Sequence, residues 1–490
     1  GFIASRGIPR THGMTLKILE CLSNLDHRGA KFADGTGDGA GVLTEIPFEL
    51  IEAELSERGL DLEERSKLGM ISCFFDPKNI NESIELIDKK LKEFDIKLLY
   101  WRKVPTDKEI LGTMAKNSKP GIYQAIICST KEYKYKFENY LYLFRKSLET
   151  DLTKNEFLNI HINSCSSRTV VYKGLFTATQ TADFYWDLRN PLYKTRYGVF
   201  HQRFSTNTTS TWDKAQPFRM LAHNGEINTI RANYSWMKAR EVDASSNLWK
   251  EDIEKLKPFI NENLSDSGQL DNAIELLVQS GRKLSHAQEM LIPSAWENNP
   301  RFTKDQQAYY QYHAFLSEPW DGPAAIVSTD GEDIIAGLDR SGLRPLRWMV
   351  SDRYILAASE VGICPSVEAG AYKTAQLEPG QTIRYRIKTD ELLDEQEVIE
   401  KLSEKNPYKE WVKTKPLVAD TEFSDKPDEM ELDQLSDYFQ YTPEEERLIL
   451  LPMIQGDIPT GSMGNDSPLA VLSKTKPRLS RYFHQMFAQV

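Results

Sequence analysis

The most informative stretch of the chain is Gln216-Pro217-Phe218-Arg219-Met220-Leu221-Ala222-His223-Asn224-Gly225-Glu226-Ile227-Asn228. Its Asn224-Gly225 pair lies between apolar residues, a pattern that usually marks a tight turn. The functional alternative is an oxyanion hole, in which the Asn224 side-chain amide and the Gly225 backbone N–H point together at an oxygen that gains negative charge during acyl transfer. His223 could act as a base in that case, although a histidine held by neighbouring backbone groups is more common.

Two polar segments on either side of this stretch offer groups that recognise an amino acid. His201-Gln202-Arg203-Phe204-Ser205-Thr206-Asn207-Thr208 follows a predicted strand, and its Arg203 can hold a carboxylate through two parallel N–H bonds. The aperiodic residues 205–213 form either a lid over a site or an exposed loop. Ser265-Asp266-Ser267 precedes a predicted helix, so it caps that helix, or its Asp266 accepts an α-ammonium group. Taken singly, such segments are more commonly a surface ion pair and a helix cap.

The glycine-rich run Asp34-Gly35-Thr36-Gly37-Asp38-Gly39-Ala40-Gly41 is only superficially like a dinucleotide-binding loop. Such a loop needs a strand before it and a helix that starts on its last glycine, where the phosphates rest. Here a predicted helix and His27-Arg28-Gly29 come before the run, and residues 42–47 follow it as a strand. The run is therefore expected to be a turn or a bulge in which backbones approach closely.

The composition of the 490 residues excludes several classes of protein. The five cysteines are scattered without a Cys-x-x-Cys pair, which excludes a sequence-readable iron–sulfur or zinc site and favours a reducing compartment. No run approaches the roughly 20 apolar residues of a membrane span, and no signal peptide or basic face for nucleic acid is visible. We therefore expect a cytoplasmic protein, or a plastid protein in a photosynthetic eukaryote, that binds no metal, membrane or nucleic acid.

The net charge of −11 is concentrated in one segment. Residues 391–446 contain 18 Asp+Glu and 6 Lys+Arg, a net charge of −12, whereas the other 434 residues carry 54 acids and 55 bases. High charge with weak periodicity is typical of a solvated connector. We therefore expect a main domain over 1–390, an acidic connector over 391–437, and the truncated α/β beginning of another domain over 438–490.

Secondary-structure patterns before residue 390 predict a mixed α and β domain. Apolar residues at helical spacing predict a helix over 13–26 with Cys21 in its buried stripe. The predicted elements do not alternate regularly enough for a doubly wound parallel sheet. The other predicted strands are 68–75, 123–128, 169–172, 198–204, 324–328, 354–357 and 382–386, and the other predicted helices are 81–94, 133–148, 229–240, 270–280 and 305–316.

Together the polar segments provide receptors for a carboxylate, an ammonium and an oxyanion, which suits an amino-acid amide as substrate. With these residues the chain resembles the N-terminal glutaminase region of glutamate synthases, a class II glutamine amidotransferase of the N-terminal-nucleophile type. The resemblance extends over nearly the whole chain. Besides the segments quoted above, it rests on His27-Arg28-Gly29-Ala30, Glu318-Pro319-Trp320-Asp321-Gly322-Pro323, Asp339-Arg340-Ser341-Gly342-Leu343-Arg344-Pro345, Ala358-Ser359-Glu360 and Gly461-Ser462-Met463-Gly464-Asn465-Asp466-Ser467-Pro468-Leu469-Ala470.

The resemblance implies an α+β fold, a four-layer αββα sandwich, and it implies roles for four residues. Arg203 would bind the α-carboxylate of L-glutamine and Asp266 its α-amino group, while Asn224 and Gly225 would form the oxyanion hole. The implied reaction is hydrolysis of glutamine to glutamate and ammonia, which is then used in the reductive amination of 2-oxoglutarate. No cofactor is expected in this segment. FMN, an iron–sulfur cluster, the central and FMN-binding domains, and a small reductase subunit or ferredoxin as partner are implied for the complete protein.

The start of the chain departs from the family pattern. The family begins with its catalytic cysteine in Cys-Gly-Val/Ile-Gly-Phe, whereas this chain begins at the matching Gly1-Phe2. The thiol and the free α-amino group that serves as its base are expected just before Gly1, so the chain as written is expected to be inactive. Because the receptors for carboxylate, ammonium and oxyanion are all present, we expect a clipped fragment rather than an inactive homologue.

Two other functions fit the same residues. One is the glutaminase domain of another class II amidotransferase, such as a phosphoribosyl- or asparagine-forming enzyme, and the sequence beyond Val490 would separate it from a glutamate synthase. The other is a catalytically silent module that binds glutamine or serves as a scaffold. The lack of a cysteine before Gly1 would favour that module.

Overall fold

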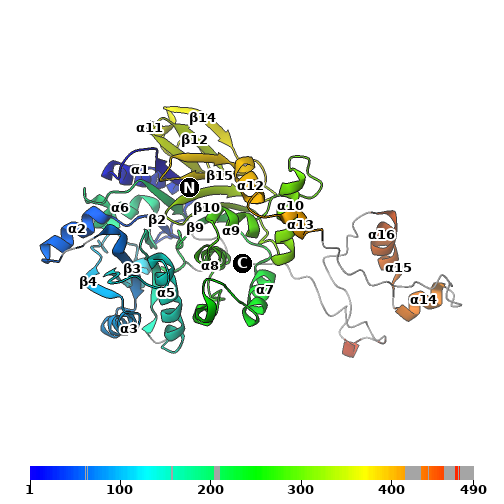
Figure 1. Cartoon of the computed structure of the whole chain (residues 1–490), viewed down its shortest axis with the longest axis horizontal. Coiled ribbons are helices and arrows are strands. Elements are labelled where there is room, and N and C mark those ends of the chain that lie inside the picture. Colours follow the sequence, from blue (N-terminus) through cyan, green and yellow to red (C-terminus); the bar gives the residue numbers. More distant parts are fainter. Residues whose placement is uncertain are drawn as a thin grey trace. The chain divides into compact units, whose positions relative to one another are not determined.

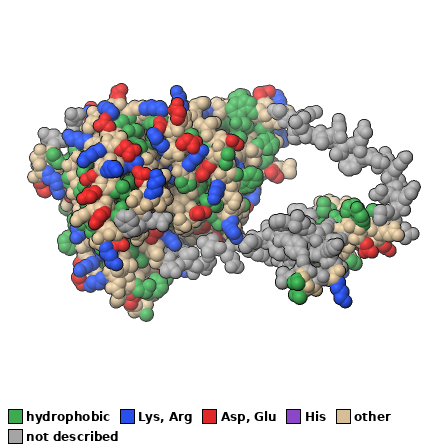
Figure 2. All heavy atoms as spheres, turned by 90° about the horizontal axis from the view of Figure 1, so that it is seen from below, with side chains coloured by type: hydrophobic (Ala, Val, Ile, Leu, Met, Phe, Trp, Pro, Cys, Tyr) green, Lys and Arg blue, Asp and Glu red, His purple; other side chains and the backbone are tan. Residues whose placement is uncertain are grey.

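The computed structural model describes residues 1–60, 62, 64–155, 158–203, 210–413, 432–439, 441–456, 470–472 and 474 (Figure 1). The chain divides into two compact units, Gly1–Lys413 and a smaller one within Thr414–Gln489. Within the described ranges, no helix is long and apolar enough to cross a lipid bilayer. On the face of the first unit shown in Figure 2, blue Lys and Arg side chains alternate with red Asp and Glu side chains.

Two antiparallel sheets form the centre of the first unit (Figure 1). Strand β1 (Phe2–Ser5) lies in the larger sheet between β13 (Tyr354–Ala358) and β8 (Tyr197–Gln202). The order of the larger sheet is β14 (Ala371–Gln376), β12 (Arg347–Ser351), β13, β1, β8, β2 (Ala40–Glu45) and β7 (Thr169–Gly174). The order of the smaller sheet is β16 (Glu391–Asp394), β15 (Thr382–Arg386), β11 (Asp333–Leu338), β10 (Ala324–Thr329) and β9 (Leu221–Gly225).

The innermost part of the core lies between these two sheets. Alternate residues of a strand point to opposite faces, so Phe2 and Ala4 point the same way and share a buried cluster with Val327 and Ile383 of the smaller sheet. Full burial of a large apolar side chain such as Phe2 stabilises the folded protein by about 1.5–3 kcal/mol. The apolar start of β1 is therefore explained by its place at the centre of the fold, where both of its faces are covered.

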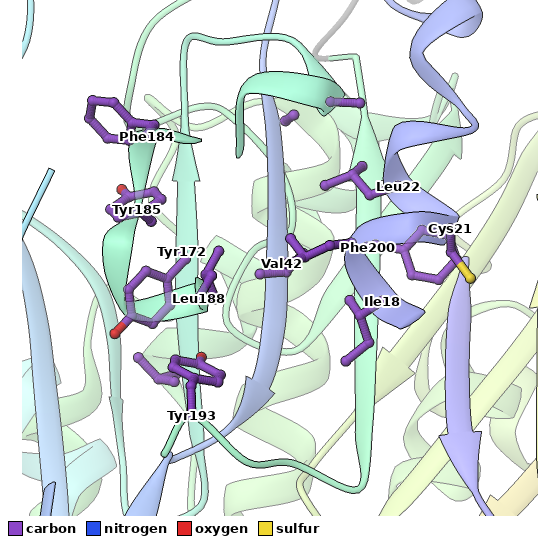
Figure 3. Packing of buried hydrophobic residues seen from close by; sticks show 14 of the residues in the cluster. Ile18, Cys21, Leu22, Val42, Tyr172, Phe184, Tyr185, Leu188, Tyr193 and Phe200 are labelled. Atoms are coloured by element: carbon purple, nitrogen blue, oxygen red, sulfur yellow. The ribbon is translucent and has the colours of Figure 1, made fainter. Parts of the chain in front are cut away.

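Helices cover the outer face of the larger sheet. Ile3 points to that face, and helix α1 (His12–Ser23) packs Ile18 and Cys21 there beside other apolar side chains (Figure 3). Thr11 caps the helix, since its hydroxyl accepts a hydrogen bond from the Met14 amide at 3.1 Å. The predicted helix over 13–26 is confirmed, with its end three residues earlier, and Cys21 is a core residue as predicted.

Helices also cover the outer face of the smaller sheet. Leu221, Ile326 and Ile335 share a second buried cluster with apolar residues of α8 (Asp266–Gln279) and α9 (Leu284–Leu291). The layers therefore run helix, sheet, sheet, helix. The four-layer αββα sandwich, an α+β fold, is confirmed.

A third antiparallel sheet extends the first unit. The strand predicted over 68–75 is β3, which lies between β5 and β6. The order is β4 (Lys97–Lys103), β5 (Gly121–Cys128), β3 (Leu68–Phe75) and β6 (His161–Ser166). The first unit also contains the helices α2 (Phe48–Glu57), α3 (Ile80–Glu93), α4 (Thr113–Asn117), α5 (Phe137–Thr153), α6 (Thr181–Phe184), α7 (Ile230–Val242), α10 (Lys304–Leu316) and α11 (Pro365–Glu368).

The main domain extends further than the composition predicts. Residues 391–413, which we expected to be the start of the connector, fold onto the first unit as β16, α12 (Glu395–Ser403) and α13 (Tyr408–Trp411). Val398 and Ile399 of α12 are buried in a cluster with aromatic residues of α10. Most of the acids of α12 lie on its other faces. The number of charges in this segment therefore did not reveal that α12 is an amphipathic helix. The expected boundary at 390 is therefore corrected to Lys413.

The described part of the second unit consists of short helical segments. They are α14 (Leu432–Phe439), α15 (Pro443–Glu445), a π-helical turn at Glu446–Leu450, α16 (Leu451–Gln455) and a 3₁₀ turn at Ala470–Leu472. Helix α14 crosses the boundary that we expected between 437 and 438. The connector residues 414–431 and most of the Gly461–Ala470 motif lie outside the described residues.

Candidate functional site

A cavity of about 270 Å³ lies in the first unit, where β1 begins, β8 and β9 end, and α8 begins. All four residues that the sequence assigns to the site line this cavity, namely Arg203, Asn224, Gly225 and Asp266. Gly1 lines it as well. Segments that are far apart in the sequence therefore converge on one place in the fold.

Asn224 and Gly225 end a strand at the edge of the smaller sheet and do not form a tight turn. In the ladder between β9 and β10, Asn224 pairs with Ala325 and Gly225 with Ala324. Gly225 has a φ of +151°, and a Cβ atom there would lie 1.8 Å from the Pro323 carbonyl oxygen, so this position requires glycine. The turn interpretation is therefore wrong, because the dipeptide alone says nothing of the strand that pairs with it.

The backbone N–H of Gly225 points away from β10. Glu226 N donates to Pro323 O at 3.0 Å and Thr329 N donates to Met220 O at 2.8 Å, so the even-numbered residues of β9 form the hydrogen-bonded pairs. The two kinds of pair alternate along an antiparallel ladder. Residues 221, 223 and 225 therefore turn their N–H groups toward the open edge of the sheet.

Side chains cover two of these three edge amides. Leu221 N donates to Asp271 Oδ1 at 3.2 Å, and His223 N donates to Gln216 Oε1 at 2.7 Å. The third residue, Gly225, lies on the cavity wall with Asn224 beside it. A backbone N–H and a side-chain amide next to a cavity form an arrangement suited to an oxygen that gains negative charge.

Asp266 is held in place at the start of α8. Ser265 caps this helix, as one of the two interpretations predicted, with its hydroxyl accepting from Gly268 N at 3.2 Å. The Asp266 carboxylate accepts hydrogen bonds from Ile227 N at 2.8 Å and from the Ser267 hydroxyl at 3.2 Å. A negative charge is favourable at a helix N-terminus. The carboxylate is therefore fixed on the cavity wall, where a cationic group can meet it.

Arg203 follows the last residue of β8 with an unusual backbone. Its φ of +88° is rare for any residue other than glycine, and its N–H donates to Gly39 O at 2.8 Å. Gly39 belongs to the glycine-rich run, which leads into strand β2 as predicted and not into a helix. The Arg203 side chain is 43% exposed and lines the cavity. Residues 204–209 lie outside the described residues, and they include 205–209 of the run 205–213 that is expected to be a lid or a loop.

Two histidines, the partly buried His201 and the buried His223, support the strand ends and carry no charge near neutral pH. His201 Nε2 lies 3.0 Å from His223 O and donates to it, while His223 Nδ1 lies 2.7 Å from the Ser267 hydroxyl. Burial lowers the pKa of His201 to about 3 and also lowers the pKa of His223. His201, Ser267 and Gln216 were inside the quoted motifs, but the sequence did not reveal their supporting contacts because these join different segments.

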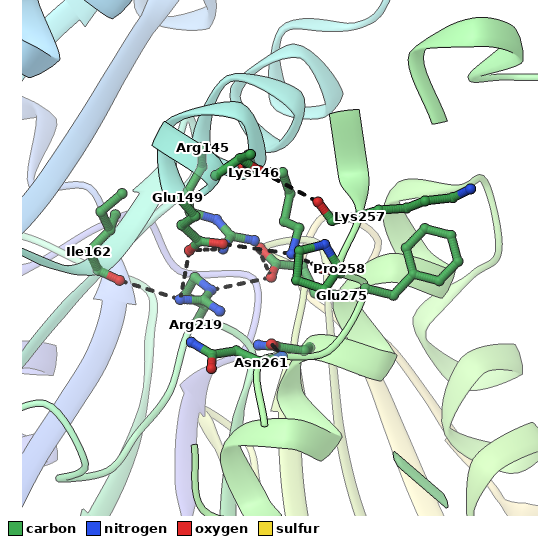
Figure 4. A network of polar contacts seen from close by, with 12 residues as sticks. Arg145, Lys146, Glu149, Ile162, Arg219, Lys257, Pro258, Asn261 and Glu275 are labelled. Atoms are coloured by element: carbon green, nitrogen blue, oxygen red, sulfur yellow. Dashed lines mark hydrogen bonds and ion pairs between the residues drawn. The ribbon is translucent and has the colours of Figure 1, made fainter. Parts of the chain in front are cut away.

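A buried cluster of charges ties the start of β9 to two helices (Figure 4). Arg219, just before β9, pairs with Glu275 of α8 at 3.2 Å. Arg145 of α5 pairs with the same carboxylate at 2.5 Å and also with Glu149. Burial alone would raise the pKa of Glu149, but the charges of Arg145 and Lys146 hold it at about 2. The cluster therefore keeps its ions at neutral pH while it fixes the segment that leads to Asn224.

Comparison with known proteins identifies the two units separately. The family described as glutamine amidotransferases class-II matches residues 1–411, and the glutamate synthase central domain matches residues 434–490. The large chain of glutamate synthase [NADPH] from Bacillus subtilis is 40% identical over 98% of this chain and 32% of its own. Ferredoxin-dependent glutamate synthase from Pyropia yezoensis is 38% identical over 100% of this chain and 33% of its own.

A more distant relative is glutamate synthase [NADH] from Saccharomyces cerevisiae, 36% identical over 100% of this chain and 24% of its own. The chain therefore spans a third or less of the length of these relatives. Among solved structures, the allosteric regulatory enzyme of purine biosynthesis matches 73% of this chain and 48% of its own at 15% identity and a TM-score of 0.31. The class II family match covers the αββα unit and the whole cavity wall, and the chain belongs to the class II glutamine amidotransferases.

Proposed function

We propose that this chain is the glutaminase part of a glutamate synthase, which hydrolyses L-glutamine to L-glutamate and ammonia. The observation that carries the proposal is the convergence of Arg203, Asp266 and the Asn224-Gly225 pair on one cavity. Glutamine has three matching groups, an α-carboxylate, an α-ammonium and a side-chain carbonyl oxygen. The match to the glutamate synthase central domain at residues 434–490 supports this enzyme over other class II amidotransferases.

Each receptor suits one group of the substrate. The Arg203 guanidinium offers parallel N–H donors that fit a carboxylate, and the fixed Asp266 carboxylate offers an acceptor to the ammonium. With the α-carbon end held by these two residues, the γ-amide extends toward Asn224 and Gly225. Their N–H groups stabilise the negative charge that forms on the carbonyl oxygen during attack, and fixed donors need no reorganisation at that moment.

The nucleophile in this proposal is a cysteine three residues before Gly1, as the family start Cys-Gly-Val/Ile-Gly-Phe implies. Gly1 and Phe200 exchange backbone hydrogen bonds of 2.8 and 2.9 Å, so β1 enters the cavity beside β8. Because the two strands are antiparallel, residues added before Gly1 in the same register would pair in turn with His201, Gln202 and Arg203. The cysteine would therefore lie beside the cavity.

The chemistry follows from these positions. The α-amino group of the cysteine, with a pKa of about 8, takes the thiol proton as the sulfur attacks the γ-amide carbon. The same amine returns the proton to the nitrogen as the C–N bond breaks and ammonia leaves. Water then attacks the γ-glutamyl thioester with the amine as base, the C–S bond breaks, and glutamate is released with the thiol restored.

We further propose that the complete protein uses this ammonia to aminate 2-oxoglutarate reductively, with FMN and an iron–sulfur cluster outside this chain. Among the described residues, no group of three or more His, Cys, Asp or Glu side chains is placed to hold a metal ion. The described residues therefore offer no set of ligands that fits a cluster. A reductase subunit or ferredoxin would supply electrons, in the cytoplasm or in a plastid.

The proposal is tested with a version of the chain that begins Cys-Gly-Val before Gly1. We expect it to release glutamate and ammonia in equal amounts from L-glutamine, because it combines the nucleophile, its amine and the oxyanion donors. A matched version beginning Ala-Gly-Val is expected to bind glutamine and release neither product. If the cysteine version also binds glutamine without releasing products, hydrolysis is contradicted and the silent binding module is favoured.

A further inference from the structure

The carboxylate of Asp38 lies in the glycine-rich run beside the cavity and is almost completely buried. Only 3% of the residue is exposed, and neither carboxylate oxygen receives a hydrogen bond of normal geometry from the described residues. Arg203 provides the nearest charge, with its Nε 3.7 Å from Asp38 Oδ2. This Nε is also buried and makes no hydrogen bond to the described residues. Two complementary groups therefore face each other just beyond hydrogen-bonding distance.

The local backbone fixes Asp38 in this position. A Cβ atom at Gly37 would lie 2.2 Å from the Phe176 carbonyl carbon, and Gly39 has a φ of +126°. Both neighbours therefore need to be glycine, and Asp38 N donates to Ala30 O at 3.0 Å. Since Arg203 N donates to Gly39 O, the same short run of backbone sets the distance between Asp38 and Arg203.

A buried carboxylate without a full set of hydrogen-bond partners destabilises the folded protein. Its presence at this position therefore suggests a functional role. Burial raises the pKa of Asp38, while the Ala30 amide and the charge of Arg203 act in the opposite direction. Asp26 is a further acid close enough to raise the pKa. Arg203 is the side-chain cation whose charge lowers the pKa of Asp38.

We propose that Asp38 is a positioning residue for Arg203, which holds the Nε side of the guanidinium so that its two terminal NH₂ groups present a fork to the α-carboxylate of the substrate. The inference rests on the proposed function, in which Arg203 binds that carboxylate. When the carboxylate binds, the Nε–Oδ2 contact shortens from 3.7 Å to a charge-assisted hydrogen bond of about 2.7–2.9 Å. Asp38 thereby favours ligands with an α-carboxylate and acts without touching them.

Calorimetric titration of the full chain with two ligands tests this role. The ligands are L-glutamine and its α-carboxamide, in which the carboxylate is replaced by a neutral amide. We expect Asp38→Asn to weaken glutamine binding about tenfold, within the range for a hydrogen bond between charged groups, and to leave binding of the carboxamide unchanged. Asp34→Asn is the matched control, because Asp34 is an exposed acid of the same run that bonds Thr36 and Met114 instead. This control is expected to bind glutamine normally.

Each outcome of the titration decides between specific alternatives. Equal glutamine affinity of Asp38→Asn and the unaltered chain would overturn the inference, and so would an equal loss for both ligands, since general damage to the site affects both. Absence of glutamine binding by the unaltered chain would overturn the proposed function itself. If Asp38→Asn does not fold, a crystal structure of the unaltered chain with glutamine decides, because an Nε–Oδ2 distance that remains near 3.7 Å contradicts the inference.

Discussion

Gly225 and Asp266 show how single residues build the site. The missing side chain of Gly225 lets Pro323 O approach closely and leaves the backbone of β9 on the cavity wall. Two hydrogen bonds, from Ile227 N and the Ser267 hydroxyl, fix the carboxylate of Asp266 in place. Groups fixed in this way need little rearrangement when charge develops in a transition state. The catalytic proposal therefore depends on geometry that exists before any ligand binds.

Asn224 provides a direct test of the oxyanion hole. In the version that begins with cysteine, we expect Asn224→Ala to lower kcat by about 10²–10³ with little change in KM, because the lost donor acts mainly on the transition state. Steady-state release of ammonia measures this effect. Asn228→Ala is the matched control, since Asn228 lies in the same segment but is exposed and is not on the cavity wall. Equal losses in the two variants would contradict the assignment.

Glu289 provides a test of stability against pH. Burial and the nearby Glu395 raise the pKa of Glu289 from 4.5 to about 8, although Tyr310 and Thr382 both donate to its carboxylate. Between these two pH values the unfolded chain loses the proton and the folded chain keeps it, so stability falls as the pH rises. We expect Glu289→Gln to remove this slope and to raise the thermal unfolding midpoint at pH 8, with little change at pH 4.5.

Two results would contradict this prediction for Glu289→Gln. One is an unfolding midpoint at pH 8 no higher than that of the unaltered chain, and the other is an equal rise of the midpoint at both pH values. The exposed Glu297→Gln serves as control. We expect this surface substitution to change stability by no more than about 0.5 kcal/mol at either pH.

Short motifs in the sequence predict the candidate site residues. Arg203, Asn224, Gly225 and Asp266 are assigned from such motifs and from the family resemblance, and all four line one cavity. The sequence did not identify Asp38, which looked like part of a turn. The role proposed for Asp38 depends on its distance from Arg203, which lies far from it in the sequence, and no local pattern encodes that distance.

At the scale of elements, helix α8 anchors the open edge of strand β9, whose other edge pairs with β10. Asp271 of α8 accepts hydrogen bonds from Met220 N at 2.8 Å and Leu221 N at 3.2 Å, and Glu275 pairs with Arg219. A slip of one residue along the ladder would turn every side chain of the strand to the other face. These contacts therefore fix the register that brings Asn224 and Gly225 to the cavity.

Arg145 tests the contribution of the buried cluster to stability. It is 1% exposed and pairs with Glu149 and Glu275, so Arg145→Ala leaves the buried Glu275 and the partly buried Glu149 with fewer cations. Loss of one partner of a buried pair costs about 3–5 kcal/mol. In contrast, Arg65→Ala removes surface pairs with Glu49 and Glu52, each worth at most about 1 kcal/mol. Urea unfolding of both variants measures the difference, and similar losses would contradict a structural role for the cluster.

At the scale of the whole molecule, the sequence predicted the layers better than the boundaries. Strands such as 68–75 were correct because their apolar runs reflect burial on both sides. The connector was placed too early because α12 exposes Glu397 and Glu400 while it buries Val398 and Ile399 against α10. The average charge of a segment reflects the residues that such a helix exposes to solvent. It does not reveal the apolar residues that the helix buries.

The corrected boundary predicts how the chain tolerates truncation. A chain that ends at Lys413 is expected to keep the glutamine affinity and the unfolding midpoint of the first unit. A chain that ends at Asp390 loses β16 and α12, and with them the burial of Leu393, Val398 and Ile399, each worth about 1.5–3 kcal/mol. We expect a clearly lower midpoint by circular dichroism. Equal midpoints would show that residues 391–413 are not part of the folded domain.

We propose that one cavity receives all three recognition groups of glutamine. A crystal structure of the chain with bound L-glutamine decides this. We expect the α-carboxylate on the Arg203 guanidinium, the α-ammonium on the Asp266 carboxylate, and the γ-carbonyl oxygen within hydrogen-bonding distance of Asn224 Nδ2 and Gly225 N. Glutamine bound outside this cavity, or bound in the reverse direction with its γ-amide on Arg203, would contradict it.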